Sequence, residues 1–483
     1  MSSLIKRTFN NILWLIVSEI FAKGLLFIST LYLARTLGTT GFGRYSLAVT
    51  FGLYLWAVVD MGVTAYGLRE IARDRARAES LLCVLNTLRL VLSFIVIVIA
   101  SIAVLLLDTT AETRIALVLG GLYACASALS PDWVMQGLER MEYLAASNAI
   151  ISVSYLLALY LFVHSQADTF AAILYRSLTV LLGASVAMGI LAKKLNIRYR
   201  WSFSLTEWRF HARESIYFAL IGVLNGFALT IPVFFLGVWF SLDEVALYSS
   251  SQRTVSLLVG AAAVIPLASY PMLSSLFISD LASFGRIHDR FERVMIYLGL
   301  PIGAMGWALS EKAIVALYGN SFRGGAALFS IMIWLVPMMF IRVNYGRSLA
   351  SAGYHRFNSL ATFAGAVTSI GCSILLIPSY RGVGASWAVL AGEAVILGIM
   401  AVMFRGKVHR STILDGQTAK VLVSCAVTAL LVRSLDLSLA NSLALGTTCY
   451  ISISFIVGLL TPSMIGEIYR KIFTDRISTN LTL

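Results

Sequence analysis

The sequence predicts an all-α integral membrane protein, with about 14 transmembrane helices arranged as two parallel six-helix lobes plus two C-terminal helices. Three observations lead to this prediction. Of the 483 residues, 59% are hydrophobic and only 13% are charged, about half the charged fraction of an ordinary soluble domain. Apolar runs of about 20 residues recur from end to end, without a long hydrophilic stretch between them. A short internal similarity pairs the start of each half.

The first apolar run, from Ile12 to about Leu33, is too long for a cleavable signal peptide and contains Glu19 and Lys23. It is therefore predicted to be the first permanent span. Barrel strands would give alternating segments of about ten residues, so the spans are helices. The run 245–277 exceeds one perpendicular crossing and is expected to tilt or bend near Pro266 and Pro271. The predicted helices are 10–34, 43–66, 81–107, 114–137, 143–164, 168–192, 214–239, 245–277, 291–316, 325–350, 356–378, 382–404, 418–436 and 440–461.

The basic residues orient this set of helices, because loops on the cytoplasmic side are rich in Lys and Arg. With Lys6 and Arg7 on the cytoplasmic side, 24 loop cations fall on that side and 7 on the other. Both chain ends are then expected in the cytoplasm. The formal net charge of +13 follows mostly from this topology. The cations are spread over thin loops, which favours contact with anionic lipid headgroups and argues against nucleic acid.

The internal similarity lies in the loops that follow the first and seventh helices. Residues 33–46 end in Tyr45-Ser46, and residues 236–249, 203 positions later, end in Tyr248-Ser249. This pairing gives an N-lobe over residues 1–192 with helices 1–6, and a C-lobe over 214–405 with helices 7–12. A basic cytoplasmic loop, 193–213, joins the lobes, and residues 406–483 add helices 13 and 14 and a cytoplasmic tail. Parallel lobes around a midplane cavity are an arrangement that secondary transporters use for alternating access.

The motifs of several functional classes are absent from the sequence. The five cysteines are scattered singly and no Cys/His cluster occurs, so neither a disulfide framework nor a metal site is predicted. No GxxxxGK[ST] segment, nucleophile–base motif or long loop for an active-site domain is present. We therefore expect a transporter without a cofactor, driven by an ion, potential or substrate gradient, and not an enzyme.

Charged residues inside the predicted spans are the candidates for function. Such groups are costly in lipid and therefore face an aqueous cavity or pair with one another. Arg176, Arg253 and Arg342 have no acidic residue one turn away on their own helices, and a guanidinium offers a fork of donors that matches phosphate oxygens. The candidate cavity cations are Lys23, Arg89, Arg176, Arg253 and Arg342; the candidate ion-coupling or gating acids are Glu19, Asp60, Asp132 and Glu393.

These candidates have simpler structural readings as well. Glu19 and Lys23, at i and i+4, can neutralise each other locally, and Arg89 can extend to the interface. Asn225, Gln252 and Asn344 could bind hydroxyl groups of a substrate, although a hydrogen bond to a neighbouring helix is the commoner role of such residues. Pro131, next to Asp132, is expected to break the fourth helix at a gating position.

The loop motif LARxLGxxGFGRY at residues 33–45, followed by Arg69-Glu-Ile-Ala-Arg73, resembles the opening of the Wzx-like polysaccharide-biosynthesis flippases of the MATE-like MOP superfamily. In the second half, Leu317-Tyr-Gly-x-x-Phe322 and Ile377-Pro-x-x-x-Gly-x-Gly-Ala385 agree with that family. The resemblance covers about residues 8–405. An Asn usual in helix 11 is absent from 362–377, where Ser369 and Ser373 are the nearest polar residues.

The resemblance implies a flippase that moves undecaprenyl-pyrophosphate-linked oligosaccharide repeat units for O-antigen or exopolysaccharide across the inner membrane. Its partners would be that lipid-linked oligosaccharide, membrane lipids, and the polymerase and glycosyltransferases of the same pathway. Two alternatives stay open at this point. A multidrug or metabolite antiporter of the same superfamily would favour a more acidic cavity, and a membrane polysaccharide polymerase would favour a large external loop.

Overall fold

The computed structural model describes residues 2–262, 264–409, 416–435 and 437–456; within these ranges, the side chains of residues 2–19, 217–229 and 261–271 are outside the description. Every regular element in the described ranges is a helix, as predicted. The helices are α1 (Ser2–Asp60), α2 (Val63–Arg73), η1 (Arg75–Arg77), α3 (Ala78–Leu105), α4 (Ala111–Ala128), α5 (Asp132–Gly137), α6 (Met141–Phe162), η2 (Gln166–Asp168), α7 (Thr169–Lys194), α8 (Leu205–Trp239), α9 (Leu242–Ala262), α10 (Val264–Ser279), α11 (Leu281–Ala308), α12 (Ser310–Tyr318), η3 (Asn320–Phe322), α13 (Gly325–Met332), α14 (Leu335–Ser351), α15 (His355–Lys407), α16 (Gly416–Ser434) and α17 (Leu439–Ile456).

Two of these helices each join a pair of predicted spans. α1 changes direction at Gly38, whose φ of 66° is readily available only to glycine. α15 does so at Arg381, whose φ is 50° and whose guanidinium lies 3.8 Å from a Glu244 carboxylate oxygen. Among the described residues, nine helices are long and apolar enough to cross a membrane, or ten with the bent pair α11–α12. Because α1 and α15 both contain two predicted spans, this result is roughly consistent with the expected 14.

The break of the fourth span predicted at Pro131 is confirmed, because α4 ends at Ala128 and α5 begins at Asp132. Other predicted boundaries need correction. The ninth span begins ten residues earlier than predicted, where Asp280 caps α11 by accepting from Ser283 N, and it bends by 78° before α12. The run 245–277 is helical in all its described residues, as α9 up to Ala262 and α10 from Val264, and the bend expected near Pro266 and Pro271 stays a prediction.

The segment predicted as a basic loop, 193–213, is largely ordered. α7 continues to Lys194, and Ser204 caps α8 by accepting a hydrogen bond from Glu207 N. Between them the chain runs along α3: Tyr199 OH lies 3.0 Å from Thr87 Oγ1, and Ser202 N donates to the same oxygen. Half-buried and exposed side chains alternate over residues 195–200 and again over 201–204, the period-2 pattern of an extended chain on a surface.

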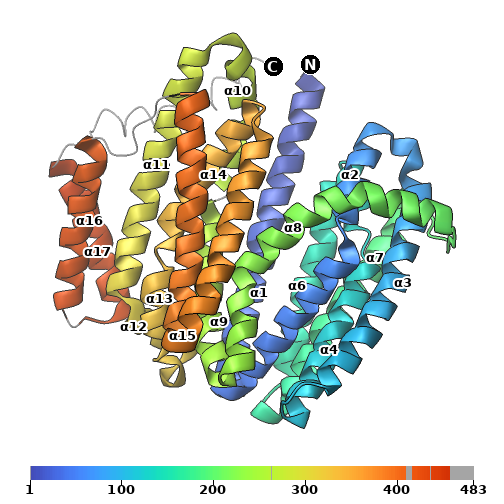
Figure 1. Ribbon diagram of the computed structural model, residues 1–483. Coiled ribbons are helices and arrows are strands. Elements are labelled where there is room, and N and C mark those ends of the chain that lie inside the picture. The colour runs from blue at the N-terminus through green and yellow to red at the C-terminus, as the bar shows by residue number, and fades with distance from the viewer. Residues whose placement is uncertain (1, 263, 410–415, 436, 457–483) are drawn as a thin grey trace.

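The helices form two bundles that diverge from a common end (Figure 1). The second half of α1 packs with α4, α6 and α7, and α3 packs on α4; on the other side, α9, α11, α13, α14 and α15 pack together with α8. α16 and α17 pack on each other and α16 packs on α11, at the left edge of Figure 1.

The end at which the bundles meet is called the closed end here. It is defined by cross-bundle contacts of Arg35, Thr40 and Phe42. Arg35 Nε donates to the Leu317 carbonyl at 2.9 Å, and the Phe42 and Phe322 rings meet edge to face. Thr40 Oγ1 donates to Asp243 Oδ1 at 2.9 Å. These two residues are 203 positions apart, the offset of the internal similarity, so the two related loops face each other.

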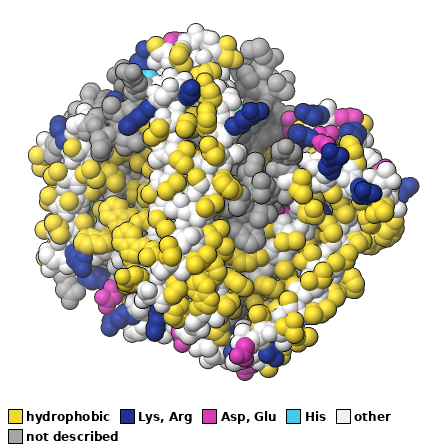
Figure 2. All heavy atoms as spheres, viewed as in Figure 1, with side chains coloured by type: hydrophobic (Ala, Val, Ile, Leu, Met, Phe, Trp, Pro, Cys, Tyr) yellow, Lys and Arg dark blue, Asp and Glu magenta, His cyan; other side chains and the backbone are white. Residues whose placement is uncertain are grey.

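The surface matches a membrane environment. Large apolar side chains on α3, such as Phe94 and Ile99, are more than 60% exposed, which only a lipid solvent favours. Figure 2 shows hydrophobic side chains covering the middle of the molecule, with charged ones gathered mainly toward the two ends. The protein is therefore a multi-pass membrane protein.

Candidate functional site

A cavity of about 400 Å³ lies in the N-terminal bundle, lined by residues of α1 to α7. Its wall contains four of the charged residues predicted from the sequence: Lys23, Arg89, Asp132 and Arg176. These residues are far apart in the chain and come from four different helices, α1, α3, α5 and α7. Three of the four are cations, so the cavity can attract an anion.

Arg89 is the most enclosed of these cations, with only 1% of its side chain exposed. One amino nitrogen lies 3.3 Å from Asp60 Oδ1, and the guanidinium lies 4.4 Å from the centre of the Trp56 ring. Asp60 is held in turn by the Thr64 hydroxyl, which donates at 2.6 Å. Arg89 Nε and Nη1 are buried and have no hydrogen-bond partner among the described residues. Two donors of a charged group are thus left for a ligand.

Arg176 supplies a second set of donors. Its guanidinium lies 5.3 Å from the Tyr155 ring centre and 5.9 Å from that of Tyr123. Both rings offer their negative faces to the cation, but its Nη1 is buried without a hydrogen-bond partner in the described part of the chain. Since burying a charged donor unsatisfied costs a few kcal/mol, Arg176 has the properties of a ligand-binding residue.

Lys23 and Asp132 complete the charged part of the wall. Lys23 is exposed on α1, and its side chain approaches Gly260 of α9 in the other bundle. Asp132 begins α5, directly after the break at Pro131. The break therefore places a carboxylate at the cavity wall.

Arg253 occupies a different place, between the two bundles. From α9 it donates to Thr30 Oγ1 at 3.2 Å and to Ser46 Oγ at 3.5 Å, both on α1. Its guanidinium also lies over the Phe42 and Tyr45 rings. Arg253 thus joins the bundles beside the closed end and is not part of the cavity wall.

Arg342 and Glu393 form a pair inside the C-terminal bundle. Arg342 Nε lies 2.8 Å from Glu393 Oε1, with 22% and 4% of the two side chains exposed. The angle at this contact is not that of a hydrogen bond, since Oε1 has no hydrogen-bond partner among the described residues. The sequence showed no acid near Arg342 on its own helix; the fold supplies one from α15.

The remaining candidates are less informative. Asn344 is fully buried, and its amide donates to the His288 carbonyl at 3.3 Å, so it serves helix packing. Gln252 is half-buried on α9, next to Arg253. The side chains of Glu19 and Asn225 lie outside the described residues.

Comparison with known proteins adds the family. The profile of the polysaccharide biosynthesis protein family matches residues 8–277, more than half of the chain and every residue that lines the cavity. The chain belongs to this family. An Escherichia coli (strain K12) protein named "Putative O-antigen transporter" is 21% identical over 385 residues, which cover 77% of this chain and 91% of that protein.

Two solved structures share the fold at low identity. The lipid II flippase MurJ, in an inward closed conformation, aligns with a TM-score of 0.72 and 13% identity over 94% of this chain and 98% of that one. A multidrug resistance MATE family transporter of the MOP superfamily, in an inward-facing conformation, aligns with a TM-score of 0.57 and 14% identity over 82% and 94% of the two chains. The two structures therefore confirm a fold shared with MATE-like transporters, and the proteins named in these comparisons are transporters and flippases, not enzymes.

Several cavity residues were missed by sequence reasoning. Trp56 and Trp133 line the cavity, and neither was among the candidates predicted from the sequence. Trp133 Nε1 lies 3.3 Å from Asn86 Oδ1, so its ring is held in place. The available signal was that Trp56 is one turn from Asp60, and Trp133 is adjacent to Asp132.

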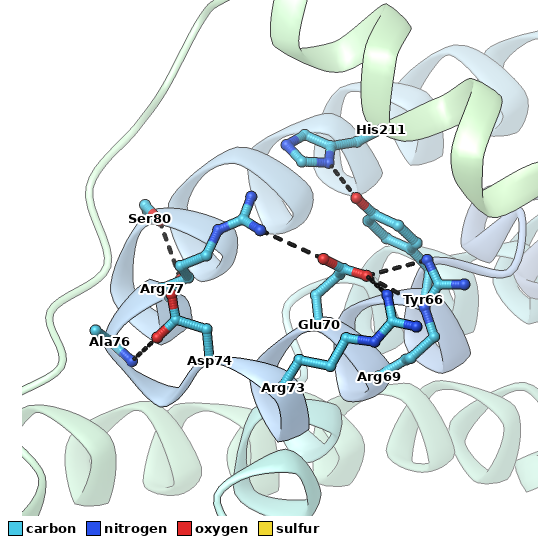
Figure 3. A network of polar contacts seen from close by, with 9 residues as sticks. All are labelled: Tyr66, Arg69, Glu70, Arg73, Asp74, Ala76, Arg77, Ser80 and His211. Atoms are coloured by element: carbon cyan, nitrogen blue, oxygen red, sulfur yellow. Dashed lines mark hydrogen bonds and ion pairs between the residues drawn. The ribbon is translucent and has the colours of Figure 1, made fainter.

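A second polar network lies around α2, in the Arg69–Arg73 motif (Figure 3). Glu70 is within 3.0 to 3.5 Å of the guanidiniums of Arg69, Arg73 and Arg77. Beside it, Tyr66 OH lies 2.9 Å from His211 Nδ1, which links α2 to the first turns of α8. Burial lowers the pKa of His211, and the positive charge of Arg77 adds to this effect. The network fastens the chain between the bundles to the N-terminal bundle.

Proposed function

We propose that this protein is a flippase for lipid-linked oligosaccharides, which carries undecaprenyl-pyrophosphate-linked polysaccharide repeat units across the bacterial inner membrane. The observation that carries the proposal is the cavity with the unsatisfied donors of Arg89 and Arg176. Pyrophosphate is a ligand that such buried guanidinium forks suit. Family membership and the O-antigen transporter among the relatives support the substrate class.

The two ends of the molecule then have different roles. Cations predicted outside the cytoplasm, such as Arg35, Arg323 and Arg381, take part in contacts at the closed end or beside it. We therefore assign the closed end to the periplasm and the chain ends to the cytoplasm. In this state the cavity would receive the headgroup from the cytoplasmic leaflet, while the polyprenyl tail stays in lipid.

Transport would follow an alternating-access cycle. Opening the periplasmic side requires breaking the contacts of Arg35, Thr40 and Arg253 across the bundles. Binding a charged headgroup can favour this change only if it stabilises the other conformation more than the present one. The acids Asp60, Asp132 and Glu393 stay candidates for coupling an ion to the change.

The test is mass spectrometry of lipid-linked intermediates in a strain that lacks the gene. Single repeat units accumulating on undecaprenyl pyrophosphate, without surface polymer, are expected. Complementation by the Arg176→Met variant should fail at normal protein level, whereas Arg433→Met, a cation outside the cavity, should restore the polymer. Unpolymerised repeats at the cell surface would instead indicate a polymerase, and an unchanged glycolipid pool would indicate a small-molecule antiporter.

A further inference from the structure

The wall of the cavity in the N-terminal bundle carries polar groups that a pyrophosphate would leave unused. The clearest is Asp132, whose Oδ1 is buried and has no hydrogen-bond partner among the described residues. Gln136 lies one turn further along α5, so the two side chains share one face of the helix, and both line the cavity. A carboxylate only accepts hydrogen bonds, and so do phosphate oxygens. A pyrophosphate therefore cannot satisfy Asp132, which needs a ligand that donates hydrogen bonds.

The backbone at Asp132 is held in place by its neighbours. Trp133 is 1% exposed, and its Nε1 lies 3.3 Å from Asn86 Oδ1. The Asn86 amide donates to the Leu129 carbonyl at 3.1 Å, so one side chain of α3 holds both sides of the break between α4 and α5. The Trp133 ring also packs on α2, where a Cβ at Gly67 would lie 2.5 Å from it. This support keeps the Asp132 carboxylate at the cavity wall, as a preorganised binding group requires.

A second amide lines the cavity from α6. Asn148 and Ser152 lie one turn apart on this helix and both belong to the wall. The Ser152 hydroxyl donates to the Asn148 backbone carbonyl at 2.9 Å, so its proton is used within the helix. The side-chain amides of Gln136 and Asn148 can each donate and accept, and Asp132 adds an acceptor. Together these groups match a sugar, because each sugar hydroxyl also donates and accepts.

The size and charge of the cavity limit what can lie beside a pyrophosphate. The volume of about 400 Å³ is near the lower end of the range for small-molecule sites, roughly 300–1,000 Å³. That space suits a pyrophosphate and one sugar, and not a complete repeat unit. The charged residues of the wall are three cations and one carboxylate. The two phosphates of a lipid-linked headgroup carry one negative charge each and would balance the excess of cations, so a further acid on the sugar would stay uncompensated.

We propose that Asp132, together with Gln136 and Asn148, forms a subsite for the sugar attached directly to the pyrophosphate, and that this sugar is neutral or basic and not acidic. The Asp132 carboxylate accepts a hydrogen bond from a hydroxyl or amide of that sugar, while Arg89 and Arg176 hold the phosphates. A uronic acid in this place would meet Asp132 with a like charge, which costs affinity. The inference rests on the proposed flippase function and adds the residue that selects the sugar.

The test measures the affinity of the purified full-length protein for three soluble probes. These are farnesyl pyrophosphate and the same compound carrying one glucose or one glucuronate on its terminal phosphate. The wild type should bind the glucosyl probe most tightly, and the glucuronosyl probe about tenfold or more weakly than the glucosyl one. Asp132→Asn should weaken binding of the glucosyl probe about tenfold or more, because a charged acceptor is lost. The same variant should bind the glucuronosyl probe more tightly than the wild type does, a gain that misfolding cannot produce.

Two further variants separate the sugar from the phosphates. Glu139→Gln is the matched control, because it makes the same change at an exposed carboxylate that pairs with Arg75 and does not line the cavity. This control should bind all three probes like the wild type. Arg176→Met should weaken binding of all three probes, whereas Asp132→Asn should not weaken binding of farnesyl pyrophosphate.

The outcomes distinguish this inference from the proposed function. If the wild type and Asp132→Asn bind each probe equally, the sugar subsite is overturned and the flippase proposal still stands. Equal affinities with a changed dependence on Na⁺ or pH would overturn the subsite as well, and would assign Asp132 to ion coupling. A wild type that binds none of the three probes would refute the flippase proposal and this inference with it.

Discussion

Replacement of Arg35 by alanine tests how the closed end is held. The wild-type side chain donates from Nε to the Leu317 carbonyl at 2.9 Å and from Nη2 to the Ala316 carbonyl. Both acceptors belong to α12, on the other side of the junction. A charged donor to a carbonyl is worth about 1.5–3 kcal/mol when buried, but Arg35 is exposed. Solvent screening reduces the pair of bonds to about 1–2 kcal/mol in total.

This loss should shift the equilibrium between the two access states. A change of about 1–2 kcal/mol alters a population ratio about 5- to 30-fold, toward the state open at this end. Spin labels at Ala111 and Asn320, both exposed and one from each bundle, should report a larger long-distance fraction by pulsed electron resonance. The five native cysteines would first be replaced.

The matched control is Arg114→Ala. Arg114 donates from Nε and Nη2 to a single carbonyl, that of Leu107, seven residues away in the same bundle. The Arg114→Ala substitution removes similar hydrogen bonds but no contact between the bundles, so the distance distribution should stay that of the wild type. If Arg35→Ala and Arg114→Ala give the same distribution, the contacts of Arg35 do not hold the closed end.

A steric change should have the same effect by another route. A Cβ on Gly43 would lie 1.8 Å from the Leu242 carbonyl oxygen, across the junction. Real atoms cannot approach so closely, and the obstacle is backbone, so Gly43→Ala must push the bundles apart. Increased labelling of a cysteine placed at Thr40 by a membrane-impermeant maleimide is expected, and unchanged labelling would contradict the packing described.

Three further predictions concern single groups. Arg176→Met should reduce the affinity for a soluble pyrophosphate-linked oligosaccharide about tenfold or more, because a charged hydrogen bond is worth about 1.5–3 kcal/mol. Arg176→Lys keeps the positive charge and should lose less affinity. Equal affinities of the wild type and Arg176→Met would exclude Arg176 from the site. Glu393→Gln leaves Arg342 without its counter-charge and should destabilise the protein by about 3–5 kcal/mol, measured by thermal unfolding. Replacing both residues with apolar ones should recover most of this loss of stability. Burial lowers the pKa of His211, so the unfolded chain binds a proton at this histidine more readily than the folded protein does. The stabilising contribution of His211 is therefore complete above the ordinary histidine pKa and falls as the pH drops below it. His211→Phe should flatten the dependence of stability on pH between about pH 7 and 5, and an unchanged dependence would refute the assignment.

The sequence predicted most of the fold because lipid imposes strong rules on it. Apolar length located the spans, and the motif around Gly38 located the reversal in α1. The bend of α11–α12 was missed, since no proline or glycine stands at Leu309 to signal it. The early start of α11 was missed because its first turns carry Arg286 and Arg290, which read as loop but are helical at the membrane surface.

The sequence predicted only part of the candidate site. The free-energy cost of placing a charge in lipid identified Lys23, Arg89, Asp132 and Arg176, and the fold places all four in the wall of one cavity. Pairing across helices could not be predicted, since it depends on which faces meet: Arg342 contacts Glu393 from α15, and Arg253 contacts α1. The contact between His409 and Asp289, which are 120 residues apart, could not be predicted for the same reason.

The central claim, that this protein moves a lipid-linked oligosaccharide across the bilayer, is tested most directly in vesicles. The purified protein would be reconstituted with a fluorescent undecaprenyl-pyrophosphate oligosaccharide in both leaflets, and an external quencher would then report how much label lies outside. Translocation should make label from the inner leaflet accessible in vesicles with the wild type, and not in vesicles with Arg176→Met reconstituted at equal density. If accessible label stays at the value of protein-free vesicles under every ion gradient and membrane potential applied, the flippase account is wrong.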